Sequence, residues 1–154
     1  MIIKILFVCH GNICRSPMAQ SIMSWLLERE GMSDCVHVDS VATSTEEIGN
    51  GVHWGTREKL REMGIPCLPH HARQITRFDI ERSDYVIAMD ALNIRNLRRM
   101  FGDRVPATLL LDYTDSPRDI SDPWYSGNFD ATFDDILKGC QGLLEEIKAT
   151  LDSP

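Results

Sequence analysis

The chain has 154 residues, of which 43% are hydrophobic and 25% charged, as is usual for a globular domain with one core. Its 16 basic and 23 acidic residues give a formal net charge of −7, which argues against nucleic acid or an anionic membrane as the main partner. No apolar run is long enough to cross a bilayer, and we expect a cytoplasmic protein. The five cysteines are irregularly spaced and match neither a secreted disulfide framework nor a four-ligand zinc site.

Apolar runs and amphipathic stretches alternate along the chain and predict strands separated by helices. The strands are expected over residues 2–8, 36–43, 84–89 and 108–111. The helices are expected over residues 16–31, 52–63, 90–102 and 133–151. The first helix should have Ser16 as its N-cap and Pro17 at its first position. Loops are expected over residues 44–51, 67–76 and 112–130.

This alternation predicts a single α/β domain over residues 1–154, with an open, parallel, four-stranded sheet of the Rossmann-like or flavodoxin-like type. Right-handed crossovers would place helices on both faces of the sheet. Ligands of such sheets bind at the carboxyl ends of the strands. We therefore expect one site, built from the loop after the first strand, residues 40–43, residues 89–90 and the long loop 112–130.

The loop after the first strand, residues 9–16, reads Cys-His-Gly-Asn-Ile-Cys-Arg-Ser and joins a buried strand to a helix N-terminus. The loop amides and the positive end of the helix dipole favour an anion there. They also favour the thiolate of Cys9, to which the Ser16 hydroxyl can donate, and Arg15 can clamp two phosphate oxygens. A cysteine after a strand is usually a structural thiol, but these neighbours predict a phosphate pocket with Cys9 as its nucleophile.

Cleavage of a phosphate ester by such a thiolate also needs a proton donor for the leaving group and a base for water. Asp122 fits best, because Pro123 restrains the backbone after it and Trp124 and Tyr125 can line a pocket mouth. A turn with two packed aromatic residues is the alternative interpretation. Three other carboxylates of the long loop compete for the role: Asp112, Asp115 and Asp119.

Residues 9–17 resemble the signature of the low-molecular-weight protein tyrosine phosphatases, and residues 122–125 match the Asp-Pro-aromatic-Tyr motif of that family. The resemblance extends over the chain and includes Ser40, residues 70–74 and residues 89–90. It implies the phosphotyrosine phosphatase I type of fold. It also implies hydrolysis of protein phosphotyrosine and small aryl phosphates through a phosphocysteine, without a metal or an organic cofactor.

The resemblance implies a role for each matching residue: Cys9 as nucleophile, Arg15 as phosphate clamp and transition-state stabiliser, and Asp122 as acid and then base. The phosphate-binding loop consists of His10, Gly11, Asn12, Ile13, Cys14, Arg15 and Ser16. The residues that support the loop are Asn12, Ser16, Ser40, His70 and Asp90. Asn12 is expected to take a positive φ, which asparagine tolerates. The implied partners are tyrosine-phosphorylated proteins and a tyrosine kinase, and the implied state is a monomer or weak dimer.

Cys14 is expected either to fill space or to form a disulfide with oxidised Cys9, which would protect Cys9 from irreversible oxidation. Glu46 and Glu47 are expected at the substrate rim with Ile13, Trp124 and Tyr125, or else in a solvated acidic loop. At the rim they would disfavour acidic phosphopeptides. No role is assigned to Trp54.

Three alternative functions remain open. Protein arginine phosphatases look similar but tend to carry threonine at the position of Ile13, where an aliphatic side chain favours a flat phenol. Arsenate reductases of this architecture need two more cysteines as a relay, and Cys35, Cys67 and Cys140 form no close pair. A non-catalytic phosphate-binding module would need neither the thiol nor the acid.

Overall fold

The computed structural model describes residues 1–152 and contains a four-stranded parallel sheet in the order β2-β1-β3-β4. The strands are β1 (Ile3–Cys9), β2 (Val36–Ala42), β3 (Tyr85–Ala88) and β4 (Ala107–Leu109). The helices are α1 (Arg15–Arg29), α2 (Trp54–Glu62), α3 (Arg77–Arg82), α4 (Ala91–Phe101), α5 (Pro123–Ser126) and α6 (Phe129–Asp152), with a 3₁₀ turn η1 (Leu110–Tyr113). The predicted fold class is confirmed.

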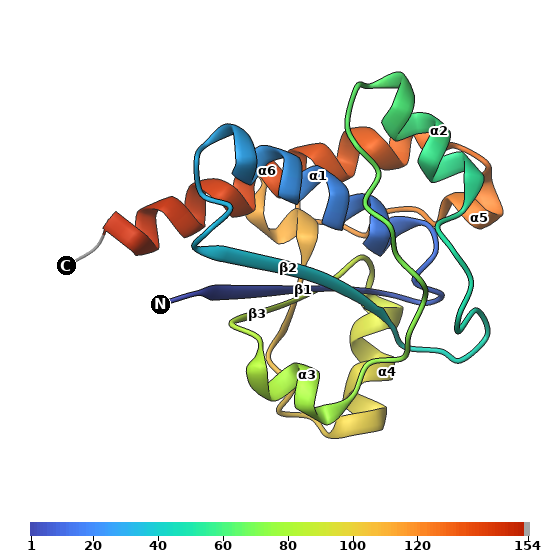
Figure 1. Ribbon diagram of the computed structural model, residues 1–154. Helices are drawn as coiled ribbons and strands as arrows, with labels where there is room; N and C mark the ends of the chain where they lie inside the picture. Colours follow the sequence, from blue (N-terminus) through green and yellow to red (C-terminus); the bar gives the residue numbers. More distant parts are fainter. Residues whose placement is uncertain (153–154) are drawn as a thin grey trace.

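Helices cover both faces of the sheet, with α1 and α6 on one side and α3 and α4 on the other (Figure 1). The side chains of β1 alternate between the two cores, as a strand buried on both faces requires. Ile5 and Phe7 pack in the core that contains residues of α1 and α6. Leu6 and Val8 pack in the core that contains Leu97 of α4. The apolar run predicted as the first strand is therefore the centre of the molecule.

Several boundaries differ from the sequence prediction. Helix α1 begins at Arg15, with Cys14 rather than Ser16 as its N-cap, so Pro17 does not occupy the first position. The backbone N–H of Met18 donates to the Cys14 carbonyl (3.2 Å), which places Ser16 inside the first helical turn. The prediction was wrong because the Ser16 hydroxyl bonds to side chains of the loop instead of capping the helix.

Two short helices were not predicted. Helix α3 starts at a capping box between Thr76 and Asp79, and α5 lies inside the long loop with Asp122 as its N-cap. Helix α6 begins at Phe129, earlier than the predicted residue 133, and α2 begins at Trp54. These helix ends depend on side chains at caps, which apolar periodicity does not record.

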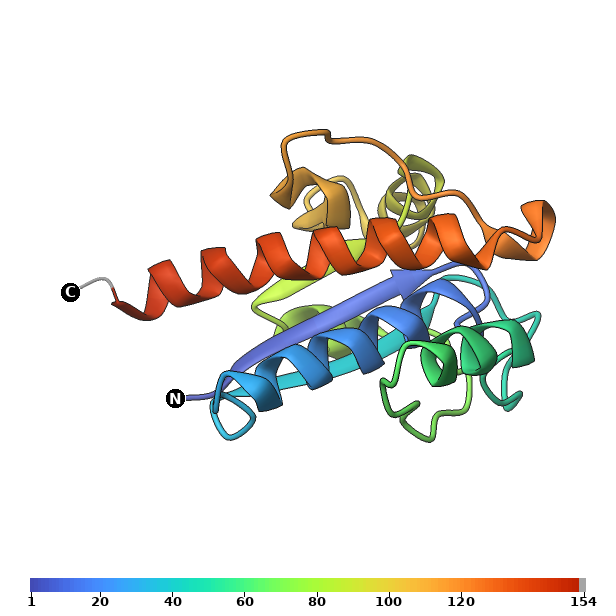
Figure 2. The ribbon, with the colours of Figure 1, turned by 90° about the horizontal axis from the view of Figure 1, so that it is seen from above.

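The long loop returns across the carboxyl ends of the strands, next to the end of β1 (Figure 2). The Ile120 N–H donates to the Met89 carbonyl (2.9 Å), which ties this loop to the end of β3. The Thr43 N–H donates to the Cys9 carbonyl (3.0 Å), which ties the end of β2 to the loop after β1. Within residues 1–152, no helix is long and apolar enough to cross a membrane.

Candidate active site

The sulfur of Cys9 is surrounded by hydrogen-bond donors at the end of β1. The Asn12 N–H donates to it at 3.3 Å, and the Ser16 hydroxyl oxygen lies 2.9 Å away. The Asn12 side-chain NH₂ donates to the Ser16 oxygen (2.8 Å), so the Ser16 proton can point at the sulfur. Cys9 is only 3% exposed. Both donors can stabilise negative charge that develops on the sulfur.

Asn12 holds the loop in its shape through bonds to both ends of its amide. Its φ is +59°, the only positive value at a non-glycine residue in the described part of the chain. Its NH₂ donates to the Ser40 hydroxyl (3.0 Å), and its carbonyl oxygen accepts from His70 Nε2 (2.7 Å). The Ser40 hydroxyl in turn donates to the side-chain oxygen Oε1 of Gln20 (2.6 Å). Of the five residues expected to support the loop, Ser16, Ser40 and His70 bond to Asn12, whereas Asp90 bonds to Arg15. Gln20 is a member of this network that sequence reasoning missed.

His70 is half-buried in this network, and burial, with Arg73 and His71 nearby, lowers its pKa below the ordinary value. A neutral ring with its proton on Nε2 can donate to Asn12, which agrees with the 2.7 Å separation. The backbone N–H of Arg73 also donates to the Asn12 carbonyl oxygen (3.3 Å). The loop is therefore fixed from the segment that follows α2, as well as from α1.

Arg15 is 2% exposed and bonded on the inner side of the pocket. Its Nη1 donates to Asp90 Oδ2 (2.7 Å) and to the Ile120 carbonyl (2.8 Å). Burial opposes the charged guanidinium, but the negative charge of Cys9 and the bond and charge of Asp90 raise the pKa of Arg15 above its ordinary value. Asp90 is itself held as the N-cap of α4, where it accepts from the Asn93 N–H (2.8 Å). No sequence signal could have found the Ile120 carbonyl, which is a backbone group.

Asp122 faces Arg15 from the long loop. Its Oδ2 lies 3.4 Å from Arg15 Nη2, and its Oδ1 accepts from the Trp124 N–H (3.0 Å) as the N-cap of α5. The competing carboxylates do not line this pocket. Asp112 accepts from the Leu109 N–H and Asp119 from the Ala91 N–H, and Asp115 lines a different hollow.

The pocket above Cys9 opens between the phosphate loop, the segment after β2 and helix α5. Its lining is Cys9, His10, Gly11, Ile13, Cys14, Arg15, Glu46, Glu47, Asp122, Trp124 and Tyr125. All five residues predicted for the rim belong to this lining. His10 Nε2 lies 2.8 Å from Glu46 Oε2, so the rim carries an ion pair when His10 is protonated.

Cys14 lies beside Cys9 in the loop but differs from it in its surroundings. Burial, the negative charge of Cys9 and the negative charge of Asp122 raise the pKa of the Cys14 thiol to about 12. Cys14 is thus a protonated thiol at neutral pH. All five cysteines are free, and within residues 1–152 no group of three or more His, Cys, Asp or Glu residues could hold a metal ion.

The fold and the site together define an α/β protein whose loop after the first strand lines a pocket with a thiol, an arginine and a carboxylate. Residues 4–153 match the family model of the low molecular weight phosphotyrosine protein phosphatases. The chain therefore belongs to this family of hydrolases, as the sequence motifs predicted.

Named relatives agree with this assignment. The low molecular weight protein-tyrosine-phosphatase YfkJ of Bacillus subtilis is 43% identical over 150 residues, which cover 95% of this chain and 96% of YfkJ. The crystal structure of YfkJ matches with a TM-score of 0.94 over 97% of each chain. The low molecular weight phosphotyrosine protein phosphatase of Rattus norvegicus is 37% identical over 150 residues, 93% of this chain and 94% of the rat protein. A structure of a Drosophila arginine phosphatase matches with a TM-score of 0.85 at 31% identity, over 95% of this chain and 98% of that one.

Proposed function

We propose that the protein hydrolyses protein phosphotyrosine and small aryl phosphates through a phosphocysteine formed on Cys9. The observation that carries the proposal is the convergence of Cys9, Arg15 and Asp122 on one pocket, each held from behind by its own hydrogen bonds. A site that only binds phosphate needs the loop amides and the arginine, but it has no need of a thiol and a carboxylate.

In the first step the Cys9 thiolate attacks phosphorus in line with the leaving oxygen. The P–S bond forms while the P–O bond breaks, and the carboxylic acid form of Asp122 gives its proton to the phenolate that leaves. The loop amides and Arg15 bind the equatorial oxygens, whose charge spreads in the transition state. Asp90 and the Ile120 carbonyl hold the guanidinium in position for this task.

In the second step Asp122, now a carboxylate, removes a proton from water as the water oxygen attacks phosphorus. The P–S bond breaks, inorganic phosphate forms, and the electron pair returns to Cys9 as a thiolate. The Ser16 hydroxyl, 2.9 Å from the sulfur, stabilises this leaving thiolate by donating to it.

The pocket walls favour a flat phenol as the phosphorylated group. Ile13 is 9% exposed at the pocket wall, and Trp124 and Tyr125 are exposed at the mouth. The structural likeness to an arginine phosphatase makes phosphoarginine the second candidate substrate. Ile13 argues against it, because the apolar side chain offers no hydrogen bond to a guanidinium.

The test is turnover of p-nitrophenyl phosphate and of matched peptides carrying phosphotyrosine or phosphoarginine. We expect hydrolysis of the aryl phosphate and the phosphotyrosine peptide, and loss of all turnover in Cys9→Ser. Preferential hydrolysis of the phosphoarginine peptide would show an arginine phosphatase, and phosphate binding without turnover would show a binding module. Turnover that survives in Cys9→Ser would contradict the nucleophile.

The partners of this activity are phosphoproteins, and we propose that a tyrosine kinase makes the substrates that the enzyme consumes. A monomer or weak dimer and a cytoplasmic location complete the proposal. A nucleophilic thiol operates best in a reducing compartment, which supports that location. A substrate-trapping pull-down with Cys9→Ser or Asp122→Ala from native lysate would identify the phosphoproteins.

A further inference from the structure

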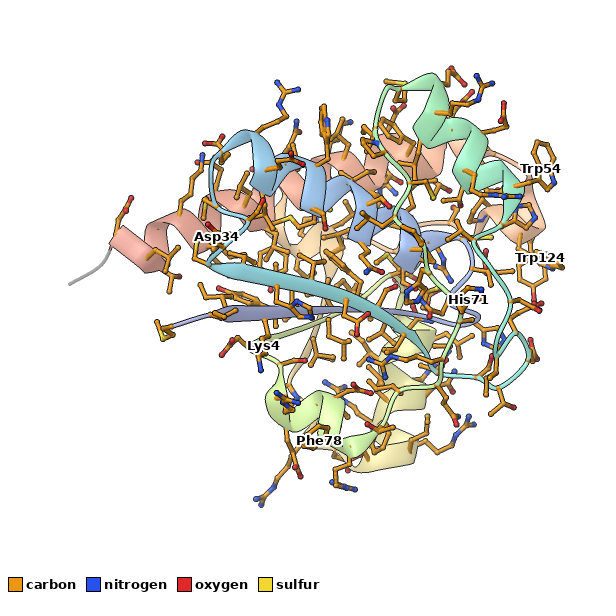
Figure 3. All side chains as sticks on the ribbon, in the orientation of Figure 1. Lys4, Asp34, Trp54, His71, Phe78 and Trp124 are labelled. Carbon is orange, nitrogen blue, oxygen red and sulfur yellow. The ribbon has the colours of Figure 1, made fainter. Side chains whose placement is uncertain are left out.

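Trp54 is a large apolar side chain without a role in the pocket chemistry, and it is 66% exposed. It stands at the start of α2, beside Trp124 of the pocket mouth (Figure 3). The two indoles share His53 as a neighbour: the His53 ring stacks on Trp54 with centroids 6.0 Å apart and meets Trp124 edge-on at 5.6 Å. Trp54, His53 and Trp124 thus form a continuous aromatic surface, called the aromatic shelf below, and Tyr125 follows Trp124 at the pocket mouth.

The shelf is tied to the phosphate-binding loop at His53 and at the first turn of α2. The His53 N–H donates to the Ile13 carbonyl (2.8 Å), and the Thr56 hydroxyl donates to the Cys14 carbonyl (3.1 Å). His53 also stacks on Phe129 of α6 at 5.4 Å. Gly55 allows this close approach, because a Cβ there would lie 2.4 Å from the Phe129 ring. These contacts hold the His53 ring in the middle of the shelf, and a group held in place before binding loses little conformational entropy when a ligand binds.

The shelf begins inside the pocket, since Trp124 lines it, and it ends outside at Trp54. A phosphotyrosine in the pocket would therefore place its own polypeptide along the shelf. Because each indole lies within 6.0 Å of His53, about two to four residues of extended peptide reach from Trp124 to Trp54. Glu46 and Glu47 also line the mouth, so the mouth offers a peptide carboxylates as well as the aromatic side chains of Trp124 and Tyr125.

We propose that Trp54 is a specificity residue that binds an aromatic side chain of the substrate, within about four residues of the phosphotyrosine. This inference rests on the proposed phosphatase activity and adds a second recognition point to it. The interaction free energy of one aromatic pair corresponds to about a three- to tenfold change in kcat/KM. Small aryl phosphates fill only the pocket, so their turnover does not depend on Trp54.

The experiment compares neutral phosphotyrosine peptides in which one phenylalanine is moved through positions −4 to +4, with an all-alanine background as reference. We expect at least one position where phenylalanine raises kcat/KM about three- to tenfold over alanine in the unaltered protein. In Trp54→Ala this preference should vanish, whereas Trp54→Phe should retain part of it. Turnover of p-nitrophenyl phosphate should be the same in all three proteins.

Phe78→Ala is the matched control, because Phe78 is an aromatic residue 60% exposed on α3, away from the shelf (Figure 3). It should keep the full phenylalanine preference. Normal turnover without any phenylalanine preference, or a preference that Trp54→Ala retains, would overturn the inference and leave the phosphatase activity standing. Absence of turnover with every phosphorylated substrate would overturn both.

Discussion

At the scale of single residues, Asn12 shows how much one side chain can determine. Its NH₂ donates to Ser16 and Ser40, and its carbonyl oxygen accepts from His70 and from the Arg73 N–H. An aspartate could make the accepting bonds but not the donating ones, and a leucine could make neither. Because Asn12 makes Ser16 an acceptor, it also directs the Ser16 proton toward Cys9. The surroundings of the Cys9 sulfur thus depend on the side-chain amide of Asn12.

Cys14 leads to a prediction about oxidation. Peroxide converts the Cys9 thiolate to a sulfenic acid and releases hydroxide. The sulfenic acid is neutral, so the negative charge of Cys9 no longer raises the pKa of Cys14. The Cys14 thiol can then condense with the sulfenic acid, forming a disulfide and water. We expect the unaltered protein to regain most activity when thiol is added after peroxide, and Cys14→Ser to lose activity irreversibly at a rate several-fold higher.

The measurement is residual p-nitrophenyl phosphate turnover after timed exposure, with and without added thiol. Cys35→Ser serves as control, because Cys35 is a free cysteine that does not line the pocket. Equal recovery of Cys14→Ser and the unaltered protein would show that Cys14 only fills space.

The acidic rim leads to a second prediction at this scale. Glu46 and Glu47 line the pocket mouth, so the double change Glu46→Gln and Glu47→Gln should raise kcat/KM for acidic phosphopeptides relative to basic ones. For exposed charges we expect about two- to fivefold at low ionic strength, declining as salt screens the interaction. A ratio that stays constant from low to high salt would place both carboxylates outside substrate contact. Turnover of p-nitrophenyl phosphate, which carries no peptide charge, is the internal control.

At the scale of elements, the contact between α6 and η1 depends on two glycines inside a helix. A Cβ on Gly142 would lie 1.9 Å from the Tyr113 carbonyl oxygen, and one on Gly139 would lie 2.4 Å from Cγ of Leu110. Glycine within a helix costs about 1 kcal/mol relative to alanine. Here the absence of side chains at both glycines allows η1 to pack directly on α6. The 3₁₀ turn η1 leads into the loop that carries Asp122.

We therefore expect Gly142→Ala to lower the free energy of unfolding by about 1–3 kcal/mol, although alanine is the better helix former. The clash is with backbone, which cannot rotate away. Gly139→Ala should also be destabilising, because the added Cβ would lie 2.4 Å from Cγ of Leu110, a side chain that is fully buried in the core. Urea denaturation of the three proteins, with equal m-values, measures both changes. A Gly142→Ala protein more stable than the original would disprove the packing argument.

The elements also show which parts of the fold a sequence can predict. The buried strand at residues 2–8 and the amphipathic stripe of the last helix are periodic signals, and both elements were predicted within a few residues. Helix α3 was missed because it is only six residues long, although its capping pair Thr76 and Asp79 is visible in the sequence. The start of α1 was misplaced because a serine before a proline looks like a cap, whereas Ser16 serves the site.

The candidate site likewise contains residues that a sequence motif predicts and residues that only the tertiary structure reveals. Cys9, Arg15 and Asp122 stand in motifs, so sequence alone could propose them. Gln20 and the Ile120 carbonyl bond to site residues through the tertiary structure, and no local sequence pattern predicts these contacts. His53 was passed over for a similar reason: its three aromatic neighbours come from distant parts of the sequence or from the adjacent residue.

At the scale of the whole molecule, His70 couples the stability of the fold to pH. Burial is the main cause that lowers its pKa, so the folded protein keeps the ring neutral where the unfolded chain would protonate it. The unfolded state then binds more protons in the window below about pH 6.5, which is the ordinary histidine value. The stability linked to His70 is present above that value and is lost as the pH falls through the lowered pKa.

We expect the free energy of unfolding to decrease as the pH falls below about 6.5, and His70→Gln to reduce this decrease. A glutamine NH₂ can still donate to Asn12 but cannot titrate. Unfolding by urea at several pH values measures the slope. His37→Gln is the matched control, because His37 is exposed on the edge strand β2. An unchanged slope in His70→Gln would remove His70 as the coupled group.

The hydrogen bonds of Asn12 to Ser40 and of Arg15 to Asp90 and Ile120 run inward. Glu46, Trp54 and Tyr125 are instead exposed to solvent. Under the proposed function, the inner set carries reactivity and the exposed set contacts the peptide around the phosphotyrosine. Residues 46–54 carry Glu46 and Trp54 of the exposed set, so we expect a graft of this segment from another member of the family to change peptide preference while turnover of p-nitrophenyl phosphate is retained. Such grafts offer a route to phosphatases that share one reaction and differ in their peptide substrates.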